Sequence, residues 1–226
     1  MMNEPDQYLL DFEERESPSL DNFVAAGNAE AVGVLREVAA GCGPRFVYLY
    51  GPPGAGVTHL LRSLSSGDTL RVPLFDPAVT IYTVDDVDEL DPGWALQLLT
   101  LQNAVRSAPN AHLVCGGHVP LQQLELPEVV KSRLGWGLCY ALEPLDEADR
   151  LEELKRQALQ RGIVLTPDML HWMAVNLPRD MRTLTCVLDE ADQLGLRRQR
   201  RVTLPLLREA VLAIEARQQE KKASEL

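Results

Sequence analysis

A glycine-rich turn between an apolar run and a helix-compatible segment constrains the fold of this chain more than any other feature. Residues 46–50 are all aromatic or aliphatic, and the turn that follows them has the spacing G-x-x-x-x-G-x-T, from Gly51 to Thr58. In such a strand–turn–helix, backbone N–H groups and the helix N-terminus together bind phosphate groups. The sequence therefore predicts a phosphate-binding loop, and the alternative is a plain Gly/Pro turn.

The predicted loop lacks one of its usual residues. Val57 stands where this motif carries a lysine, so the cation that reaches the β- and γ-phosphates is missing, whereas Thr58 keeps the hydroxyl that ligates Mg²⁺. Because a charged hydrogen bond is worth about 1.5–3 kcal/mol, we expect nucleotide affinity to be about 10- to 100-fold lower than with lysine. The predicted contacts to ADP or ATP, bound weakly or not at all, are Gly51, Pro53, Gly54, Ala55, Gly56, Val57, Thr58 and His59.

Two acids follow the next β-type run. Residues 79–84 are rich in β-branched side chains, and Asp85 and Asp86 come directly after them. A carboxylate at the C-terminal end of such a strand holds Mg²⁺, and the next acid can orient an attacking water. We therefore assign Asp85 to the metal and Asp86 to water orientation; two exposed turn aspartates are the alternative.

Strand and helix patterns alternate as far as Pro144, and only helical patterns follow. We predict a brief strand at 71–75, helices at 94–107 and 127–134, and strands at 111–115 and 138–142. Alternating elements of this length indicate a parallel, three-layer α/β sheet domain. The predicted organisation is a flexible N-terminal segment at 1–18, an α/β domain at 19–144, a small all-helical domain at 145–218 and a frayed tail at 219–226.

Composition limits the classes of partner. The net charge of −11 makes the chain a poor non-specific DNA binder, because such binding needs cations that displace counterions. The basic cluster at 197–201 is the exception, either as a solvated loop or as a contact for nucleic acid or an acidic partner.

No apolar run approaches the ~18–20 residues of a membrane span, and the acidic N-terminus is not a secretory signal. The scattered cysteines predict buried free thiols in a reducing cytoplasm.

The acidic N-terminal segment contains one apolar cluster. Gln7, Leu10 and Phe12 have the spacing Q-x-x-L-x-F. The cluster either packs back on the domain or docks into a groove of another protein, with Leu10 and Phe12 as anchors and Gln7 as a hydrogen-bonding residue. The spacing resembles the peptide by which bacterial replication and repair proteins bind the DNA polymerase sliding clamp.

The order of these motifs resembles that of AAA+ ATPases: a P-loop, a Walker B strand, a third strand with a polar turn, and a helical lid. Residues 20–24 (LDNFV), 132–137 (SRLGWG) and 179–184 (RDMRTL) resemble the DnaA branch of that family. The similarity runs from about residue 7 to residue 211. It implies that Arg133 is an arginine finger, which acts in a neighbouring subunit's site. It also implies that Arg179 is the sensor-two arginine, which reaches the phosphates of nucleotide bound in its own chain.

Two positions depart from the family pattern. Val57 removes the loop cation, and Gly117 stands where the family turn presents a polar side chain, called sensor one. Both departures weaken the chain's own ATPase site and leave Arg133 untouched. The turn that follows Gly117 also contains His118, which has no partner visible in the sequence and is interpreted as incidental.

The resemblance implies a cytoplasmic negative regulator of chromosomal replication initiation. It would be held on the sliding clamp and would stimulate hydrolysis of DnaA-bound ATP through Arg133, with no sequence-specific DNA binding of its own. The sequence ends after the helical lid, without the helix-turn-helix domain that reads origin sites, which argues against an initiator. The alternatives are a self-sufficient AAA+ ATPase such as a helicase loader, or a nucleotide-free AAA+ scaffold. A monomer, a homodimer and a larger oligomer are all compatible with the sequence.

Overall fold

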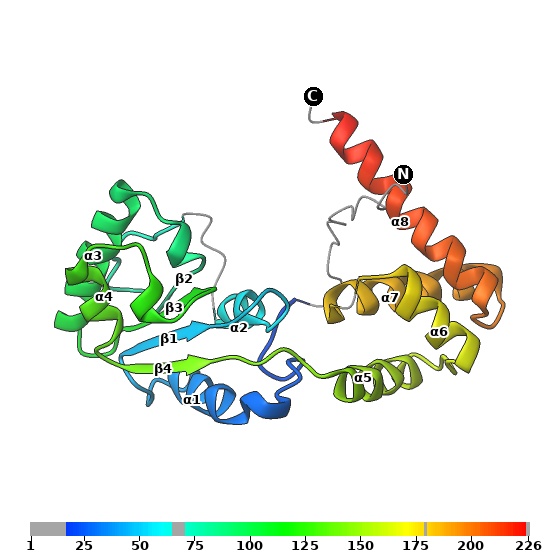
Figure 1. Cartoon of the computed structure of the whole chain (residues 1–226), viewed down its shortest axis with the longest axis horizontal. Helices are drawn as coiled ribbons and strands as arrows, with labels where there is room; N and C mark the ends of the chain where they lie inside the picture. Colours follow the sequence, from blue (N-terminus) through cyan, green and yellow to red (C-terminus); the bar gives the residue numbers. More distant parts are fainter. Residues whose placement is uncertain (1–16, 65–70, 179, 225–226) are drawn as a thin grey trace. The chain divides into compact units, whose positions relative to one another are not determined.

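The computed structural model describes the backbone of residues 17–64, 71–178 and 180–224, and side chains as far as Arg217. The chain forms two compact units, which are divided between Asp146 and Glu147 (Figure 1). The first described unit, from Ser17 to Asp146, contains every strand of the described residues. The second, from Glu147 onward, is entirely helical.

The first unit is built on a four-stranded parallel sheet. Its strands are β1 (Phe46–Tyr50), β2 (Ile81–Val84), β3 (His112–Gly117) and β4 (Leu138–Ala141), in the order β2-β3-β1-β4 (Figure 1). Because all pairings are parallel, the C-terminal ends of the strands share one edge of the sheet. This arrangement confirms the predicted parallel α/β sheet.

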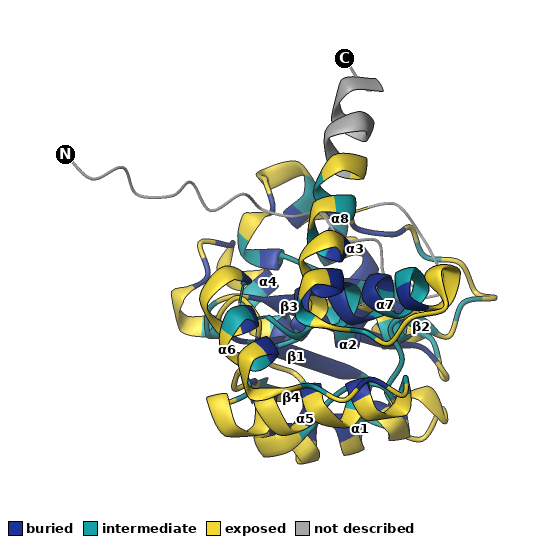
Figure 2. Ribbon diagram, turned by 90° about the vertical axis from the view of Figure 1, so that its right-hand side faces the viewer, coloured by how far each residue is buried: buried dark blue, intermediate teal, exposed yellow. Residues whose placement is uncertain are grey.

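Helices cover both faces of the sheet. Helices α1 (Ala29–Ala39) and α2 (Val57–Leu64) pack on one face, and α3 (Pro92–Ser107) and α4 (Glu128–Leu134) pack on the other. The alternation along β1 explains the three layers, because Val47 and Leu49 join the first helix pair while Phe46 and Tyr48 join the second. Short 3₁₀ turns at 26–28, 87–89 and 121–123 complete the unit. Figure 2 shows β1 as a buried element and the outer side of α1 as exposed.

The predicted strand at 71–75 is wrong. The chain there is irregular, although Val72 is fully buried in the core of the sheet domain. Pro73 has no N–H to donate to a strand ladder, and Leu74 points its side chain to solvent. The carbonyl of Val72 instead accepts a hydrogen bond from the Gln97 side chain of α3. Burial of one apolar residue therefore does not make a strand where proline interrupts the ladder.

The second unit contains α5 (Glu147–Gln160), α6 (Pro167–Asn176), α7 (Met181–Arg198) and α8 (Leu204–Ser224). Thr166 caps α6 by accepting a hydrogen bond from the Met169 N–H, and Asp180 caps α7 through the Thr183 N–H. Its core is apolar and separate from that of the sheet domain. It is formed mainly by Leu154, Ala158, Ile163, Met169, Met173, Leu184, Val187, Leu188, Leu207 and Ile214.

The cysteines only partly follow the prediction of buried thiols. None of the four forms a disulfide, but Cys42 and Cys139 are exposed, Cys186 is half-buried and Cys115 is fully buried. Cys139 lies on β4, which is an edge strand of the sheet in the described part of the chain. Within the described ranges, no helix combines the length and the apolar character that crossing a membrane requires.

Candidate functional site

The predicted phosphate loop leaves the C-terminal end of β1 and enters α2. The Gly51 N–H donates to the Gly117 carbonyl at 3.2 Å, which fixes the start of the loop to the end of β3. Gly54 and Gly56 have φ values of 87° and 92°, a conformation that glycine adopts without steric cost. The Ala55 N–H closes a turn onto the Pro52 carbonyl at 3.0 Å. The loop therefore has the tight, left-handed turns that phosphate-binding backbones use.

Val57 is the first residue of α2 and points into the core. Its side chain is only 9% exposed. A Cβ added at Gly116 of β3 would lie 2.6 Å from the Val57 Cγ1 and 3.0 Å from the Asp85 Oδ1. Glycine at position 116 thus lets the loop helix and the acidic residue approach the same strand closely. The position that carries a cation in the usual motif is an apolar packing residue here, while the neighbouring Thr58 is exposed.

Residues 19–23 pack over the loop and its helix. The His59 Nε2 lies 3.1 Å from the Ser19 carbonyl oxygen, and the His59 ring contacts Phe23 with the two centroids 5.5 Å apart. A Cβ at Gly56 would approach the Phe23 Cε2 to 2.5 Å. Both the ring face and Nε2 of His59 therefore serve the contact with residues 19–23. The sequence analysis assigned His59 to nucleotide and did not find this contact, because the two segments lie about 40 residues apart.

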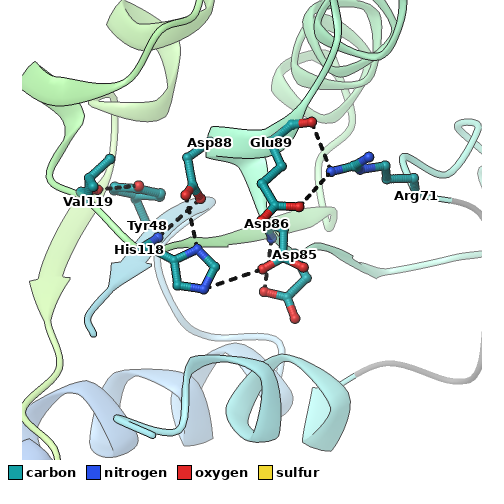
Figure 3. Close-up of polar contacts among 8 residues, drawn as sticks. All are labelled: Tyr48, Arg71, Asp85, Asp86, Asp88, Glu89, His118 and Val119. Atoms are coloured by element: carbon teal, nitrogen blue, oxygen red, sulfur yellow. Dashed lines mark hydrogen bonds and ion pairs between the residues drawn. The ribbon is translucent and has the colours of Figure 1, made fainter. Parts of the chain in front are cut away.

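The two aspartates follow the C-terminal end of β2 (Figure 3), and Asp85 approaches the same glycine of β3 as Val57 does. The Asp86 N–H donates to the Asp85 Oδ1 at 3.0 Å, and Asp86 adopts a left-handed conformation with φ of 48°. Burial raises the pKa of Asp86 above its ordinary value, and the negative charge of Asp85 raises it further. Aspartate tolerates the left-handed region better than most residues, which fits its place in this turn.

His118 is a member of this acidic group, and the sequence analysis missed it. Its Nδ1 lies 2.9 Å from the Asp88 Oδ2, its backbone N–H donates to the Asp88 Oδ1 at 3.1 Å, and its Nε2 is 3.9 Å from the Asp86 Oδ1 (Figure 3). The hydrogen bond with Asp88 is the main cause of a raised pKa of His118, and the charges of Asp86 and Glu89 add to it. The imidazole therefore bridges the ends of β2 and β3.

The structure gives a reason for glycine at the sensor-one position. A Cβ added at Gly117 would lie 2.7 Å from the Asp88 Oδ1 and 2.8 Å from the Tyr48 hydroxyl. That hydroxyl is fixed by donating to the Val119 carbonyl at 2.6 Å (Figure 3). The space of a side chain at 117 is thus already filled by polar atoms from β1 and from the turn after β2. The neighbouring His118 supplies the polar side chain at this edge.

The donor set suits Mg²⁺ only with help from a nucleotide. The described residues contain no group of three or more histidine, cysteine or acidic side chains arranged to hold a metal ion. Magnesium in nucleotide sites is bound through one or two carboxylates, waters and the phosphates themselves. Asp85 and Thr58 fit that pattern, with Asp86 placed to orient water, and these roles stay predictions.

Arg133 lies near the N-terminal end of β1, whereas the phosphate loop follows the C-terminal end of that strand. It is in the last turn of α4, where its Nη1 donates to the Leu99 carbonyl of α3 at 3.3 Å. Its Cζ is 5.3 Å from the ring centroid of Trp136, and Trp136 packs on Phe46, the first residue of β1. The loop begins after Tyr50, the last residue of β1. At ~3.3 Å per residue, the two ends of that strand are about 13 Å apart.

Four of the predicted residues cannot be placed. Gln7, Leu10 and Phe12 of the proposed clamp peptide lie outside the described residues, and so does Arg179 of the predicted sensor two. Their roles rest on the sequence alone.

The basic cluster lies at the end of α7, where Arg198 pairs with Glu209 of α8 and Arg197 donates to Gln193.

Solved structures of replication initiators share this fold. Domain III of the Thermotoga maritima replication initiation protein DnaA matches with a TM-score of 0.63 and 23% identity, over 87% of this chain and 96% of that one. A DNA replication initiation factor matches with a TM-score of 0.60 and 20% identity, over 84% and 69% of the two chains. AMPPCP-bound DnaA from Aquifex aeolicus matches with a TM-score of 0.58 and 20% identity, over 74% and 62%. The fold is that of an AAA+ protein of the DnaA type.

A second comparison concerns the helical unit. Residues 146–211 match the family described as the Hda lid domain. That match covers most of the second unit, and the DnaA-like fold includes the first. The match of residues 146–211 and the fold shared with DnaA domain III agree with the resemblance to the DnaA branch that the motif order predicted.

Proposed function

We propose that this protein is a cytoplasmic negative regulator of chromosomal replication initiation. In this role it stimulates the hydrolysis of ATP bound to DnaA by supplying Arg133 to that site, while its N-terminal peptide holds it on the DNA polymerase sliding clamp. DnaA and the β clamp of DNA polymerase III are its partners, and no sequence-specific DNA binding is needed. The relation to DnaA and the Hda-type lid support the general role as a DnaA-related replication regulator.

The position of Arg133 carries the proposal. Arg133 lies over the ring of Trp136, which packs on the first residue of β1, whereas the phosphate loop follows the last residue of that strand. In the described part of the chain it forms no salt bridge, and its hydrogen-bond acceptor is a neutral carbonyl. A half-buried guanidinium without an acid partner is available to a phosphate of another molecule. Arginines supplied in this way are worth about 10³–10⁵ in rate.

The chain's own site fits nucleotide holding better than turnover. The Gly51–Thr58 backbone keeps the shape of a phosphate cradle, but the buried Val57 supplies no charge. ADP or ATP would be bound through residues 51–59, with Mg²⁺ on Asp85 and Thr58 and with Asp86 near the attacking water. The nucleotide supplies the phosphates that complete the metal's coordination. We therefore propose that the protein is not an independent ATPase.

The decisive experiment follows hydrolysis of radiolabelled ATP on DnaA in the presence of DNA-loaded clamp. We expect Arg133→Ala to reduce the stimulated rate by at least ~10³-fold, towards the unstimulated rate. Lys131→Gln is the matched control, because it removes a cation from the same helix, where Lys131 pairs only with Glu128 among the described residues. Stimulation by Arg133→Ala equal to that of the wild type would exclude the arginine-finger role.

A self-sufficient ATPase, such as a helicase loader, is the second candidate. The retention of Asp85, Asp86 and Thr58 at the edge of the sheet favours it. In that case the isolated protein would hydrolyse ATP steadily, and Asp85→Ala would abolish the turnover. Calorimetry with ADP and ATP separates both candidates from a nucleotide-free scaffold, which would show no binding heat.

A further inference from the structure

Trp136 is the shared contact of two arginines at the edge of the sheet where β1 begins. The Cζ of Arg106 lies 4.6 Å from the Trp136 ring centroid, and the Cζ of Arg133 lies 5.3 Å from it. Phe46 packs against the same ring in a T-shaped arrangement, with the centroids 5.6 Å apart. Despite these contacts Trp136 is 41% exposed, which is unusual for so large an aromatic side chain. The ring is therefore anchored on β1 and still reachable from solvent.

These contacts restrict the guanidinium of Arg133 from two directions. Nη1 donates to the Leu99 carbonyl of α3 at 3.3 Å, and Cζ lies over the Trp136 ring, 5.3 Å from its centroid. A free arginine side chain samples many rotamers, and a guanidinium that must stabilise developing charge has to lie within a few tenths of an ångström of its working position. A residue that removes this freedom before docking increases the rate and not only the affinity.

We propose that Trp136 is a positioning residue for Arg133, which holds its guanidinium ready for a phosphate of the partner's nucleotide. This inference rests on the proposed role of Arg133 in the partner's site. It adds Trp136 as the residue that orients Arg133 for that role. Cation–π attraction is strengthened when a docked partner excludes water from the pair, so the contact strengthens at the moment it is used. Trp136 itself need not touch the nucleotide.

Arg106 is a second cation on the Trp136 ring, with its Cζ 4.6 Å from the ring centroid. It is exposed, and its own carbonyl accepts a hydrogen bond from Arg45 at 2.6 Å, which fixes its backbone at the end of α3. Arg106 and Arg133 share one ring, so each weakens the other's stacking through like-charge repulsion. Removing the charge of Arg106 should therefore leave the positioning of Arg133 intact or improve it.

The test compares Trp136→Leu with Trp136→Phe in the clamp-dependent hydrolysis of DnaA-bound ATP, over a range of concentrations of this protein. Leucine keeps apolar packing on Phe46 and loses the π face, whereas phenylalanine keeps both. We expect Trp136→Leu to lower the maximal stimulated rate by about 5- to 30-fold, to leave the half-saturating concentration within about 2-fold, and Trp136→Phe to restore most of the rate. Arg106→Gln should stimulate at least as well as the wild type.

Trp172→Leu is the matched control, because Trp172 carries a similar arginine contact, with Arg208 at 5.7 Å, in the helical unit. It should leave the maximal rate unchanged. A Trp136→Leu protein that stimulates at the wild-type maximal rate, or whose loss is entirely in half-saturation, contradicts the positioning role. If Arg133→Ala has no effect either, the proposed function has failed instead, so the two failures are distinguishable.

A measurement without any partner tests the contact itself. In the wild type, the ring current of Trp136 should displace the proton signals of the Arg133 side chain from their random-coil positions. Trp136→Leu should return them to those positions, and Trp172→Leu should not. Unshifted Arg133 signals in the folded wild type would overturn the inference even if the hydrolysis assay had shown a loss.

Discussion

His118 illustrates at the level of single residues how the fold assembles a polar group that is scattered in the sequence. Its partner Asp88 lies 30 residues earlier, and they meet because β2 and β3 are neighbours with their C-terminal ends at one edge. The sequence locates His118 in the turn that follows Gly117, but it does not indicate which of the acids at positions 85, 86, 88 and 89 reaches the imidazole. That choice depends on the left-handed turn at Asp86, which directs Asp88 back towards β3.

The His118–Asp88 pair gives a pH prediction. The pKa of His118 is raised in the folded protein, so between the unfolded value of about 6.5 and the folded pKa the native state binds more protons than the unfolded state. The pair therefore stabilises the fold fully below pH ~6.5, and this contribution is lost as the pH rises through the folded pKa. The half-exposed position keeps the effect small.

NMR titration of the imidazole measures this directly. The pKa of His118 should lie above 6.5 in the wild type, and Asp88→Asn should lower it. Arg71→Gln is a suitable control, because it removes a neighbouring ion pair with Glu89 and leaves the imidazole contacts in place. A His118 pKa that does not respond to Asp88→Asn would show that the hydrogen bond is not the cause.

At the level of elements, hydrophobic pattern was enough to predict the strands of the sheet, the loop helix and the helical unit. The pattern failed at 71–75, where Val72 is buried but Pro73 prevents pairing. It also could not foresee how tightly α2 approaches β3. Gly116 and Val57 lie far apart in the sequence, and their contact is visible only when the glycine is seen to leave no room for a methyl group.

That close approach predicts opposite outcomes for two glycine-to-alanine changes. At Gly116 a Cβ would lie 2.5 Å from the Leu61 Cδ1 and 2.6 Å from the Val57 Cγ1, both buried, so Gly116→Ala should lower the free energy of unfolding by about 1–3 kcal/mol. At Gly33, in the middle of α1, a Cβ meets no atom within 4 Å. Gly33→Ala should raise the free energy of unfolding by about 0.4–1 kcal/mol.

Urea denaturation of the three proteins checks both signs. Equal m-values would show that the variants differ in stability and not in the extent of unfolding. A Gly116→Ala protein as stable as the wild type would mean that α2 can move away from β3 without cost. In that event the loop helix is less firmly placed than the packing indicates.

At the level of the whole molecule, the net negative charge gives a physical reason for the proposed clamp-binding peptide. A chain of net charge −11 gains little from DNA phosphates, so reaching a DNA-bound partner requires another route. A peptide that binds a clamp already loaded on DNA raises the effective concentration of the AAA+ domain near that partner. Under the proposed function, a weak contact of Arg133 and its surroundings with DnaA would then be sufficient. The motifs in the sequence predicted one segment for the clamp and another residue, Arg133, for the contact with DnaA. That Arg133 lies near the N-terminal end of β1 could be learned only from the structure.

The central claim is that the chemistry occurs in the partner's site and not in this chain's own. It is tested most directly by comparing Asp85→Ala with Arg133→Ala in the hydrolysis of ATP bound to DnaA with loaded clamp. We predict that Asp85→Ala, which removes the proposed magnesium ligand of the chain's own site, stimulates within about 3-fold of the wild type, while Arg133→Ala loses the stimulation. Loss of stimulation with Asp85→Ala and its retention with Arg133→Ala would contradict the account.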